Sequence, residues 1–196
     1  KMKKIEIKKT DILDLRTYIE KRKDIKKSIS NLKKNRRVQV GPHATFYFEC
    51  YETMLYQIQE MVYIERGGDE QLEDELKAYN PLVPKGTELV ATLMFEIGDE
   101  NIRKEFLNSI GGIENHMYIQ LFNGDKIYAI PEGDTERTND KGKASSVHFV
   151  HFKLDEKSID FFKKDQVMLG FDHENYQHMT IISKHIQDNL SEDFNQ

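Results

Sequence analysis

Residues 36–66, RRVQVGPHATFYFECYETMLYQIQEMVYIER, decide the fold of this chain. Polar and apolar residues alternate over 37–40, as in a short strand, and Gly41-Pro42 marks a turn before a second strand that includes residues 46–48. A helix is predicted from about Glu52 to Glu65. The stretch also places many polar side chains beside apolar ones, and burying such a group unpaired costs about 1–3 kcal/mol. We therefore expect either a site or a structural polar network here.

The residues before this stretch are predicted to form a basic helical segment. Thr10-Asp11 is typical of a helix N-cap, and apolar residues then recur at roughly helical spacing as far as Asn35. Residues 1–37 hold 15 Lys or Arg against 5 Asp or Glu, a net +10, whereas the rest holds 14 against 29, a net −15. We expect the segment to lie over an acidic body, of its own chain or of a partner subunit. Nucleic-acid binding through residues 1–37 is the less favoured alternative, because aromatic residues that would stack on bases are scarce there.

The chain after Asn80-Pro81 is rich in short alternating stretches. Strands are predicted over residues 88–97, 116–122, 126–130, 146–154, 166–171 and 178–183, and helices over 101–110, 156–163 and 184–194. Asn123-Gly124 between two of these strands indicates a hairpin. The fold class is therefore α+β: a mostly antiparallel sheet packed against helices on one side, with a basic helical N-terminal segment. We expect a single domain over 1–196, divided into the segment 1–35 and a body over 36–196.

Composition excludes several classes of protein. The length of 196 residues suits one domain. The longest apolar runs are far too short to span a membrane, and the start lacks the apolar core of a signal peptide, so we expect a cytoplasmic location. Cys50 is the only cysteine, which excludes an internal disulfide and a thiolate-ligated metal within one chain.

Arg36 and Arg37 are the first candidate binding residues. Neighbouring side chains on a strand point to opposite faces, so only one of the two can point inward. An inward arginine needs a carboxylate, and we expect Glu49, Glu60 or Glu96 to supply it in a structural salt bridge. The functional alternative is a clamp for the carboxylate or phosphate group of a ligand.

Histidines and carboxylates give a candidate metal site. Glu65 ends an apolar row on the predicted helix, so it is either a buried carboxylate able to hold a metal or a solvated side chain. A site built from Glu65 or Glu96 with histidines would suit iron, manganese or zinc. The histidines best placed to join it are His43, His148 and His173. The alternative is that all three are core or turn residues with structural partners.

Several motifs stand in order along the chain. They include Arg36-Arg37, Gly41-Pro42-His43, Tyr56-Gln57-Ile58-Gln59-Glu60-Met61, Tyr79-Asn80-Pro81-Leu82, Ser146-Val147-His148-Phe149 and Gly170-Phe171-Asp172-His173. With these motifs the chain resembles a bacterial family of unknown function, domain-of-unknown-function family 3501, over nearly its whole length from about Thr10. The resemblance implies one full-length domain.

The resemblance also implies a setting. Members of the family are encoded beside rubrerythrin-like di-iron proteins and an iron–sulfur oxidoreductase, which implies partners of that kind and an accessory role in redox or peroxide handling. The family pattern has an arginine at the position of His151 and an apolar residue at that of His178. Those departures weaken any metal site built on these two histidines.

The leading hypothesis is a cytoplasmic accessory protein that binds a small ligand or a metal in a redox pathway. With the polar motif positions that the resemblance implies, the candidate ligand-binding residues are Arg36, Arg37, His43, Glu49, Gln57, Glu60, Asn80, Glu96 and Asp172, and the candidate metal ligands are His148, His173 and Glu65. The main alternative is an interaction module that docks an oxidoreductase and has no catalytic site of its own; the second is nucleic-acid binding. The sequence does not decide whether the protein is an enzyme, and a homodimer is the default oligomer.

Overall fold

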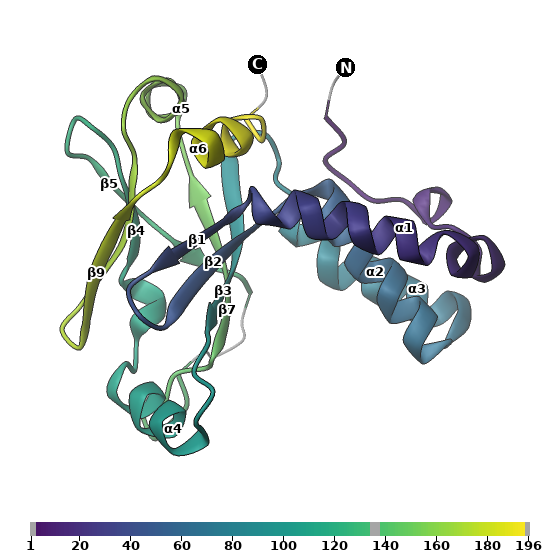
Figure 1. Cartoon of the computed structure of the whole chain (residues 1–196), viewed down its shortest axis with the longest axis horizontal. Coiled ribbons are helices and arrows are strands. Elements are labelled where there is room, and N and C mark those ends of the chain that lie inside the picture. The colour runs from purple at the N-terminus through teal and green to yellow at the C-terminus, as the bar shows by residue number, and fades with distance from the viewer. Residues whose placement is uncertain (1–2, 134–137, 195–196) are drawn as a thin grey trace.

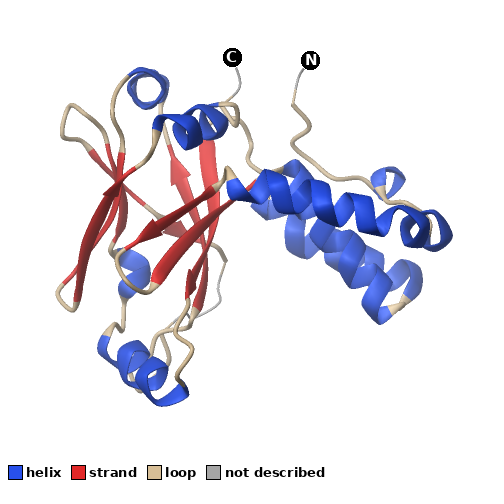
Figure 2. Ribbon diagram, viewed as in Figure 1, coloured by secondary structure: helices blue, strands red, loops and turns tan. Residues whose placement is uncertain are grey.

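The computed structural model describes residues 3–133 and 138–194. Two antiparallel sheets lie face to face, and a group of helices extends to one side of them (Figures 1 and 2). The first sheet has the order β1-β2-β3-β7-β6, with β1 Arg37–Val40, β2 Ala44–Glu49, β3 Glu88–Phe95, β7 Val147–Lys153 and β6 Ile130–Pro131. The second has the order β5-β4-β8-β9, with β5 Lys126–Tyr128, β4 Met117–Gln120, β8 Met168–His173 and β9 Tyr176–Ile181.

The helices fall into two groups. Those that extend to one side, here called the arm, are α1 Leu15–Lys34, α2 Tyr51–Glu65 and α3 Gly68–Tyr79. Those around the sheets are α4 Glu100–Ser109, α5 Glu156–Lys164 and α6 Lys184–Ser191, and the short 3-10 helices are η1 Lys9–Asp11, η2 Asn80–Leu82 and η3 Ile113–Asn115. None of the helices in the described part of the chain is long and apolar enough to cross a membrane.

The predicted α+β class and the antiparallel pairing are confirmed, but the strands form two sheets instead of one. The inward side chains of both sheets share a core that includes Phe46, Phe48, Phe152 and Phe171. Alternation puts Val38 and Val40 in this core and leaves Arg37 and Gln39 on the outer face of the first sheet. The alternation of polar and apolar residues along a strand shows which of its faces is buried. It does not show how many sheets the strands form.

The turn between β1 and β2 is anchored by the second sheet. The hydroxyl of Tyr176 accepts hydrogen bonds from the backbone N–H groups of His43 and Ala44, each at 3.1 Å, and donates to the carbonyl of Val40 at 2.7 Å. Gly41 has φ +70°, and a Cβ there would lie 2.6 Å from that hydroxyl. Glycine is therefore required, and the turn that carries His43 is held firmly.

The arm has a small apolar core of its own. Met54 and Ile58 of α2 and Leu72 of α3 pack with Ile7 of the N-terminal segment and with Val90 on the outer face of β3. The predicted helix start was wrong: α1 begins at Leu15, and its N-cap is Asp14, whose carboxylate accepts from the backbone N–H of Thr17. Residues 9–11 instead form the short 3-10 helix η1.

A buried ion pair joins the arm to the body. Arg36, between α1 and β1, donates to the backbone carbonyls of Phe48 and Glu49 and pairs with the carboxylate of Asp193. Arg36 is 4% exposed and Asp193 3%. The prediction that one of the two arginines points inward is confirmed, but the expected partners Glu49, Glu60 and Glu96 were wrong, because the carboxylate comes from the C-terminal end of the chain.

The structure predicts a large difference between the two neighbouring arginines. Arg36→Met leaves the buried carboxylate of Asp193 with the partly exposed Lys3 Nζ, 3.2 Å away, as its counter-charge, and breaking a buried pair in this way costs about 3–5 kcal/mol of unfolding free energy. Arg37→Met, at an exposed position, should change it by less than about 0.5 kcal/mol. Urea unfolding followed by circular dichroism measures both. Equal effects of the two substitutions would contradict this assignment, and the double change Arg36→Met/Asp193→Leu should recover part of the loss.

Candidate ligand site on the outer face of the first sheet

The outer face of β1 and β2 carries a polar pocket with a volume of about 460 Å³, here called the outer-face pocket. It is lined by Arg37, Gln39, Pro42, His43, Thr45, Tyr47 and Glu96. Three of these residues, Arg37, His43 and Glu96, were predicted from the sequence as ligand-binding candidates. Its volume lies within the range of small-molecule sites, roughly 300–1,000 Å³.

Strand pairing brings these side chains together. Arg37 lies opposite Tyr47, and Gln39 lies opposite Thr45, so four outward side chains form two adjacent cross-strand pairs. Glu96 follows β3, and its backbone N–H donates to the carbonyl of His43 at 2.8 Å. The β1–β2 hairpin and the end of β3 therefore build the pocket jointly.

Tyr47 links the acidic and basic sides of the pocket. Its hydroxyl donates to Glu96 Oε1 at 2.9 Å. Partial burial and this hydrogen bond raise the pKa of Tyr47, while the nearby Arg37 opposes the shift. The phenol of Tyr47 therefore stays protonated at neutral pH and remains a hydrogen-bond donor. Together, the lining residues offer a guanidinium, a carboxylate, an imidazole and hydroxyl groups within one hollow.

A buried polar layer continues along the same face of the sheet, toward the arm. The Glu49 carboxylate accepts hydrogen bonds from the hydroxyls of Thr53 at 2.6 Å and Thr92 at 2.8 Å. All three residues are buried. Both carboxylate oxygens of Glu49 are thus satisfied within the protein, which is the pattern of a structural network.

His151, which departs from the family pattern, is the centre of a second network. Its Nδ1 lies 2.8 Å from Glu88, and its Nε2 hydrogen bonds to Glu132. Burial by itself would lower the pKa of His151, but the hydrogen bonds and charges of Glu88 and Glu132 outweigh it and raise the pKa above the usual 6.5. The signal available in the sequence was that Glu88 and His151 lie on strands one expects to pair.

Other predicted site residues have structural partners away from the outer-face pocket. Glu60 accepts from the Tyr18 hydroxyl and forms two hydrogen bonds with Arg22, at 2.8 and 2.9 Å, which hold α1 on α2. Gln57 Nε2 lies 3.5 Å from the hydroxyl of Tyr79, between α2 and α3. These contacts place Glu60 and Gln57 inside the arm.

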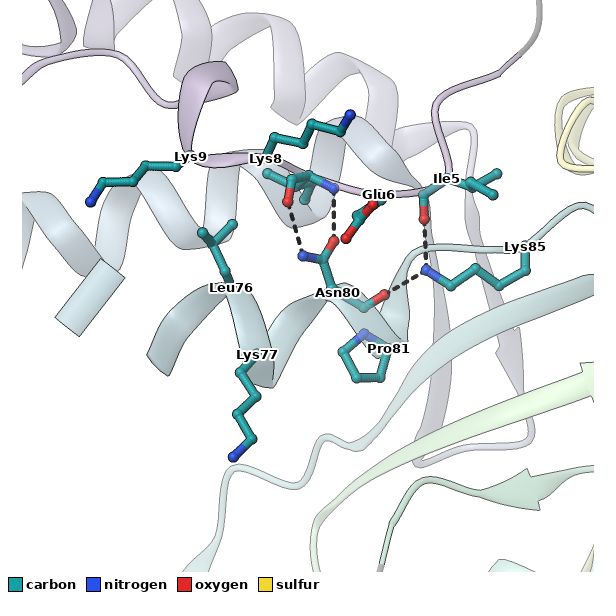
Figure 3. Close-up of a pocket in the computed structure, with 10 residues that line it drawn as sticks. Ile5, Glu6, Lys8, Lys9, Leu76, Lys77, Asn80, Pro81 and Lys85 are labelled. Carbon is teal, nitrogen blue, oxygen red and sulfur yellow. Dashed lines mark hydrogen bonds between the residues drawn. The ribbon is translucent and has the colours of Figure 1, made fainter. Parts of the chain in front are cut away.

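Asn80 lines a second, more open hollow of about 930 Å³, between the N-terminal segment and the end of α3 (Figure 3). Its side chain exchanges two hydrogen bonds with the backbone of Ile7, at 2.7 and 2.9 Å. Lys85 also fastens this segment, by donating to the carbonyls of Ile5 and Asn80. Lys9 and Lys77 point in different directions, so the charged groups do not converge on one ligand position.

The candidate metal ligands do not form a cluster. Within residues 3–133 and 138–194, no group of three or more His, Cys, Asp or Glu side chains is arranged to hold a metal ion. His148 Nε2 lies 2.8 Å from the carbonyl of Ser145, and His173 Nε2 lies 3.0 Å from that of Gly111. Glu65 is exposed at the end of α2 and accepts from Gln71. These contacts favour the structural interpretation of His148 and His173.

Asp172 lies on the other sheet, in a surface group. Its carboxylate accepts from the Tyr128 hydroxyl at 2.5 Å and lies 2.9 Å from His116 Nδ1. Burial opposes ionisation of Asp172, but these two partners lower its pKa overall. Asp172 therefore lies apart from the outer-face pocket, and His116 connects it to His173, whose ring centroid lies 5.1 Å from that of His116.

Comparisons with known proteins identify one family and one similar solved structure. The sequence model of a family described as "Protein of unknown function (DUF3501)" matches residues 6–194. A crystal structure of a novel protein of unknown function from Burkholderia pseudomallei K96243 is similar to this chain, with 32% sequence identity and a TM-score of 0.89. The alignment covers 96% of this chain and 99% of that chain. No curated protein matched the chain.

The raised pKa of His151 predicts a pH-dependent stability. The folded state binds the proton more tightly than the unfolded state, so the stabilisation is complete below about pH 6.5 and is lost as the pH rises through the raised pKa. The difference in unfolding free energy between wild type and His151→Gln should therefore be largest near pH 6 and shrink toward about pH 9. Urea unfolding across this range measures it.

Glu132→Gln provides the matched comparison, because it removes one of the two charges that raise the pKa of His151. In that background the stabilisation by His151 should be lost at a lower pH. A wild-type advantage over His151→Gln that stays constant from about pH 6 to about pH 9 would show that the imidazole is not held protonated between the two carboxylates.

Proposed function

The chain belongs to DUF3501, a family of unknown function, and we propose that it is a cytoplasmic accessory protein that binds a small ligand with an anionic group in the outer-face pocket. The observation that carries the proposal is that Arg37, Glu96 and Tyr47 line one hollow of ligand size. Guanidinium groups bind carboxylate and phosphate oxygens through paired, charge-assisted hydrogen bonds. Arg37 is the group that would hold the anionic end of the ligand.

The negative charge of Glu96, opposite to that of Arg37, restricts the chemical class of ligand that suits the pocket. Glu96 accepts from Tyr47 through one oxygen, Oε1, which leaves its other oxygen able to accept from a ligand donor. A molecule that carries both an anionic group and an ammonium or hydroxyl group would match Arg37 and Glu96 together. The proposal therefore favours an amino-acid-like ligand over a simple dicarboxylate.

A small organic ligand is better supported than a metal. The described residues contain no cluster of metal-ligating side chains, and the outer-face pocket combines a cation with a carboxylate, which suits a ligand of mixed charge. Burial raises the pKa of Cys50 to about 11, so its thiol is protonated at neutral pH. In the redox setting that the family resemblance suggests, the protein would therefore bind a ligand for its partners and would not itself exchange thiols.

Isothermal titration calorimetry with glutamate, succinate and inorganic phosphate tests the proposal. We expect glutamate to bind best, and Arg37→Gln to weaken binding by about tenfold or more, because a charge-assisted contact contributes roughly 1.5–3 kcal/mol. Glu96→Gln should weaken glutamate but not succinate or phosphate. Arg16→Gln, which removes an exposed arginine from α1, is the matched control and should leave all three unchanged.

Two results would count against the proposal. One is that wild type binds none of the three probes at concentrations up to roughly 10 mM, which corresponds to a binding free energy of less than about 3 kcal/mol. The other is that Arg37→Gln binds glutamate as well as wild type does.

A further inference from the structure

The charges of the arm are separated between its helices. Helix α1 holds eight Lys or Arg and two Asp or Glu, a net +6, whereas α3 holds five Asp or Glu and one Lys, a net −4. Both helices pack against α2. They contact it through different residues: Glu60 of α2 bonds to α1, and Glu65 of α2 bonds to Gln71 of α3. The arm therefore presents a basic helix and an acidic helix to solvent.

Little of the basic charge on α1 is neutralised within the described part of the chain. Ion pairs within 4.0 Å join Arg16 to Glu20 of the same helix and Arg22 to Glu60. Lys23, Lys26 and Lys27 are exposed. Among the residues that the structure describes, none of the three forms an ion pair within 4.0 Å with a carboxylate. The basic segment is expected to lie over an acidic body, of its own chain or of a partner subunit, and α1 extends away from the sheets of its own chain (Figure 1). Its own body therefore does not cover it.

The acidic helix shows the complementary pattern. Glu70, Glu73 and Asp74 are exposed. The ion pair recorded for α3 among the described residues is that of Asp69 with Lys9. Like charges three or four residues apart on one helix repel one another, and the approach of a partner of opposite sign relieves that repulsion.

Helix α1 is also poorly buried for its length. Of its 20 residues, Tyr18 is the buried one. At the outer end of the arm Leu15 is 39% exposed, Ile19 is 50% exposed, and Ile64 of α2 is 65% exposed. The ring of Tyr18 contacts that of Tyr63, 5.9 Å between centroids, which brings the start of α1 beside the end of α2. The end of the arm thus offers apolar side chains that a second protein surface would cover.

We propose that the arm is a dimerisation surface on which α1 of one copy lies against α3 of a second copy of this chain. In a two-fold dimer the contact occurs twice, since α1 of each copy meets α3 of the other. The net charges of +6 and −4 then attract across both halves of the interface. Leu15, Ile19 and Ile64 supply the apolar contacts.

A second copy fits the arm better than a nucleic acid does. A polyanion would be attracted to α1 but repelled by the acidic α3 on the same arm. Another copy of the chain carries both complementary charges in the same relative positions. This self-complementarity is what a closed, symmetric interface requires.

Sedimentation velocity of the full chain tests the proposal with reciprocal charge reversals. The α1 variant changes Lys23, Lys26, Lys27 and Lys34 to Glu, which takes the net charge of α1 from +6 to −2. The α3 variant changes Glu70, Glu73 and Asp74 to Lys, which takes α3 from −4 to +2. All seven positions are exposed, and lysine and glutamate are both good helix formers, so the arm should stay folded; circular dichroism verifies this.

Wild type should sediment as a dimer at about 50 mM salt and shift toward monomer at about 500 mM, because screening weakens exposed charge pairs. Each variant alone should be a monomer, since its α1 and α3 carry the same sign. An equimolar mixture of the two variants should form a heterodimer, because every facing pair of helices then has opposite signs.

Three outcomes would overturn the proposal. A wild-type protein that is monomeric at low salt would show that the arm has another partner or none. A dimer that survives both reversals would place the interface elsewhere. Two folded variants that fail to associate when mixed would show that α1 and α3 do not meet across the interface.

Discussion

The fold depends on one buried ion pair, between Arg36 and Asp193. It lies where the arm ends and β1 begins, and its guanidinium also binds the last carbonyls of β2. A buried charge must be compensated, so this position fixes which of the two neighbouring arginines points inward. The alternation of a strand then sends Arg37 to the outer face. The buried Arg36, which cannot hold a ligand, thus orients Arg37, which is proposed to hold one.

The outer face of the first sheet is divided between two roles. Toward the arm it is covered: Val90 packs in the core of the arm, and Glu49 and His151 are enclosed by hydroxyl and carboxylate partners. Toward the β1–β2 turn it is open, and the outer-face pocket lies there. Polar groups that look alike in the sequence therefore differ in the structure, because those under the arm have internal partners and those beyond it face solvent.

Local sequence pattern was enough to predict much of the strand pairing. Alternation over residues 37–40 and 46–48 indicated the hairpin, and Asn123-Gly124 indicated the β4–β5 pair, both confirmed. Local sequence pattern could not predict long-range partners. Asp193 lies far along the chain from Arg36, and no residue near Asp193 marks it as the partner. His151 was set aside because a family pattern differs there, yet its two glutamates give it a structural role. Arg37, His43 and Glu96, three of the ligand-binding candidates from the sequence, line the outer-face pocket, and the spacing of single residues did not show that Tyr47 would join them.

The most direct test of the account is to map where a ligand binds. Titration of ¹⁵N-labelled protein with glutamate, followed through backbone amide chemical shifts, reports ligand-induced changes along the whole backbone in one experiment. The account predicts shifts concentrated in residues 37–47 and 94–97, around the outer-face pocket, and their disappearance in Arg37→Gln. Shifts centred on the hollow beside Asn80, or on the Asp172 group of the second sheet, would show that the ligand site lies elsewhere and that Arg37 is only a surface residue.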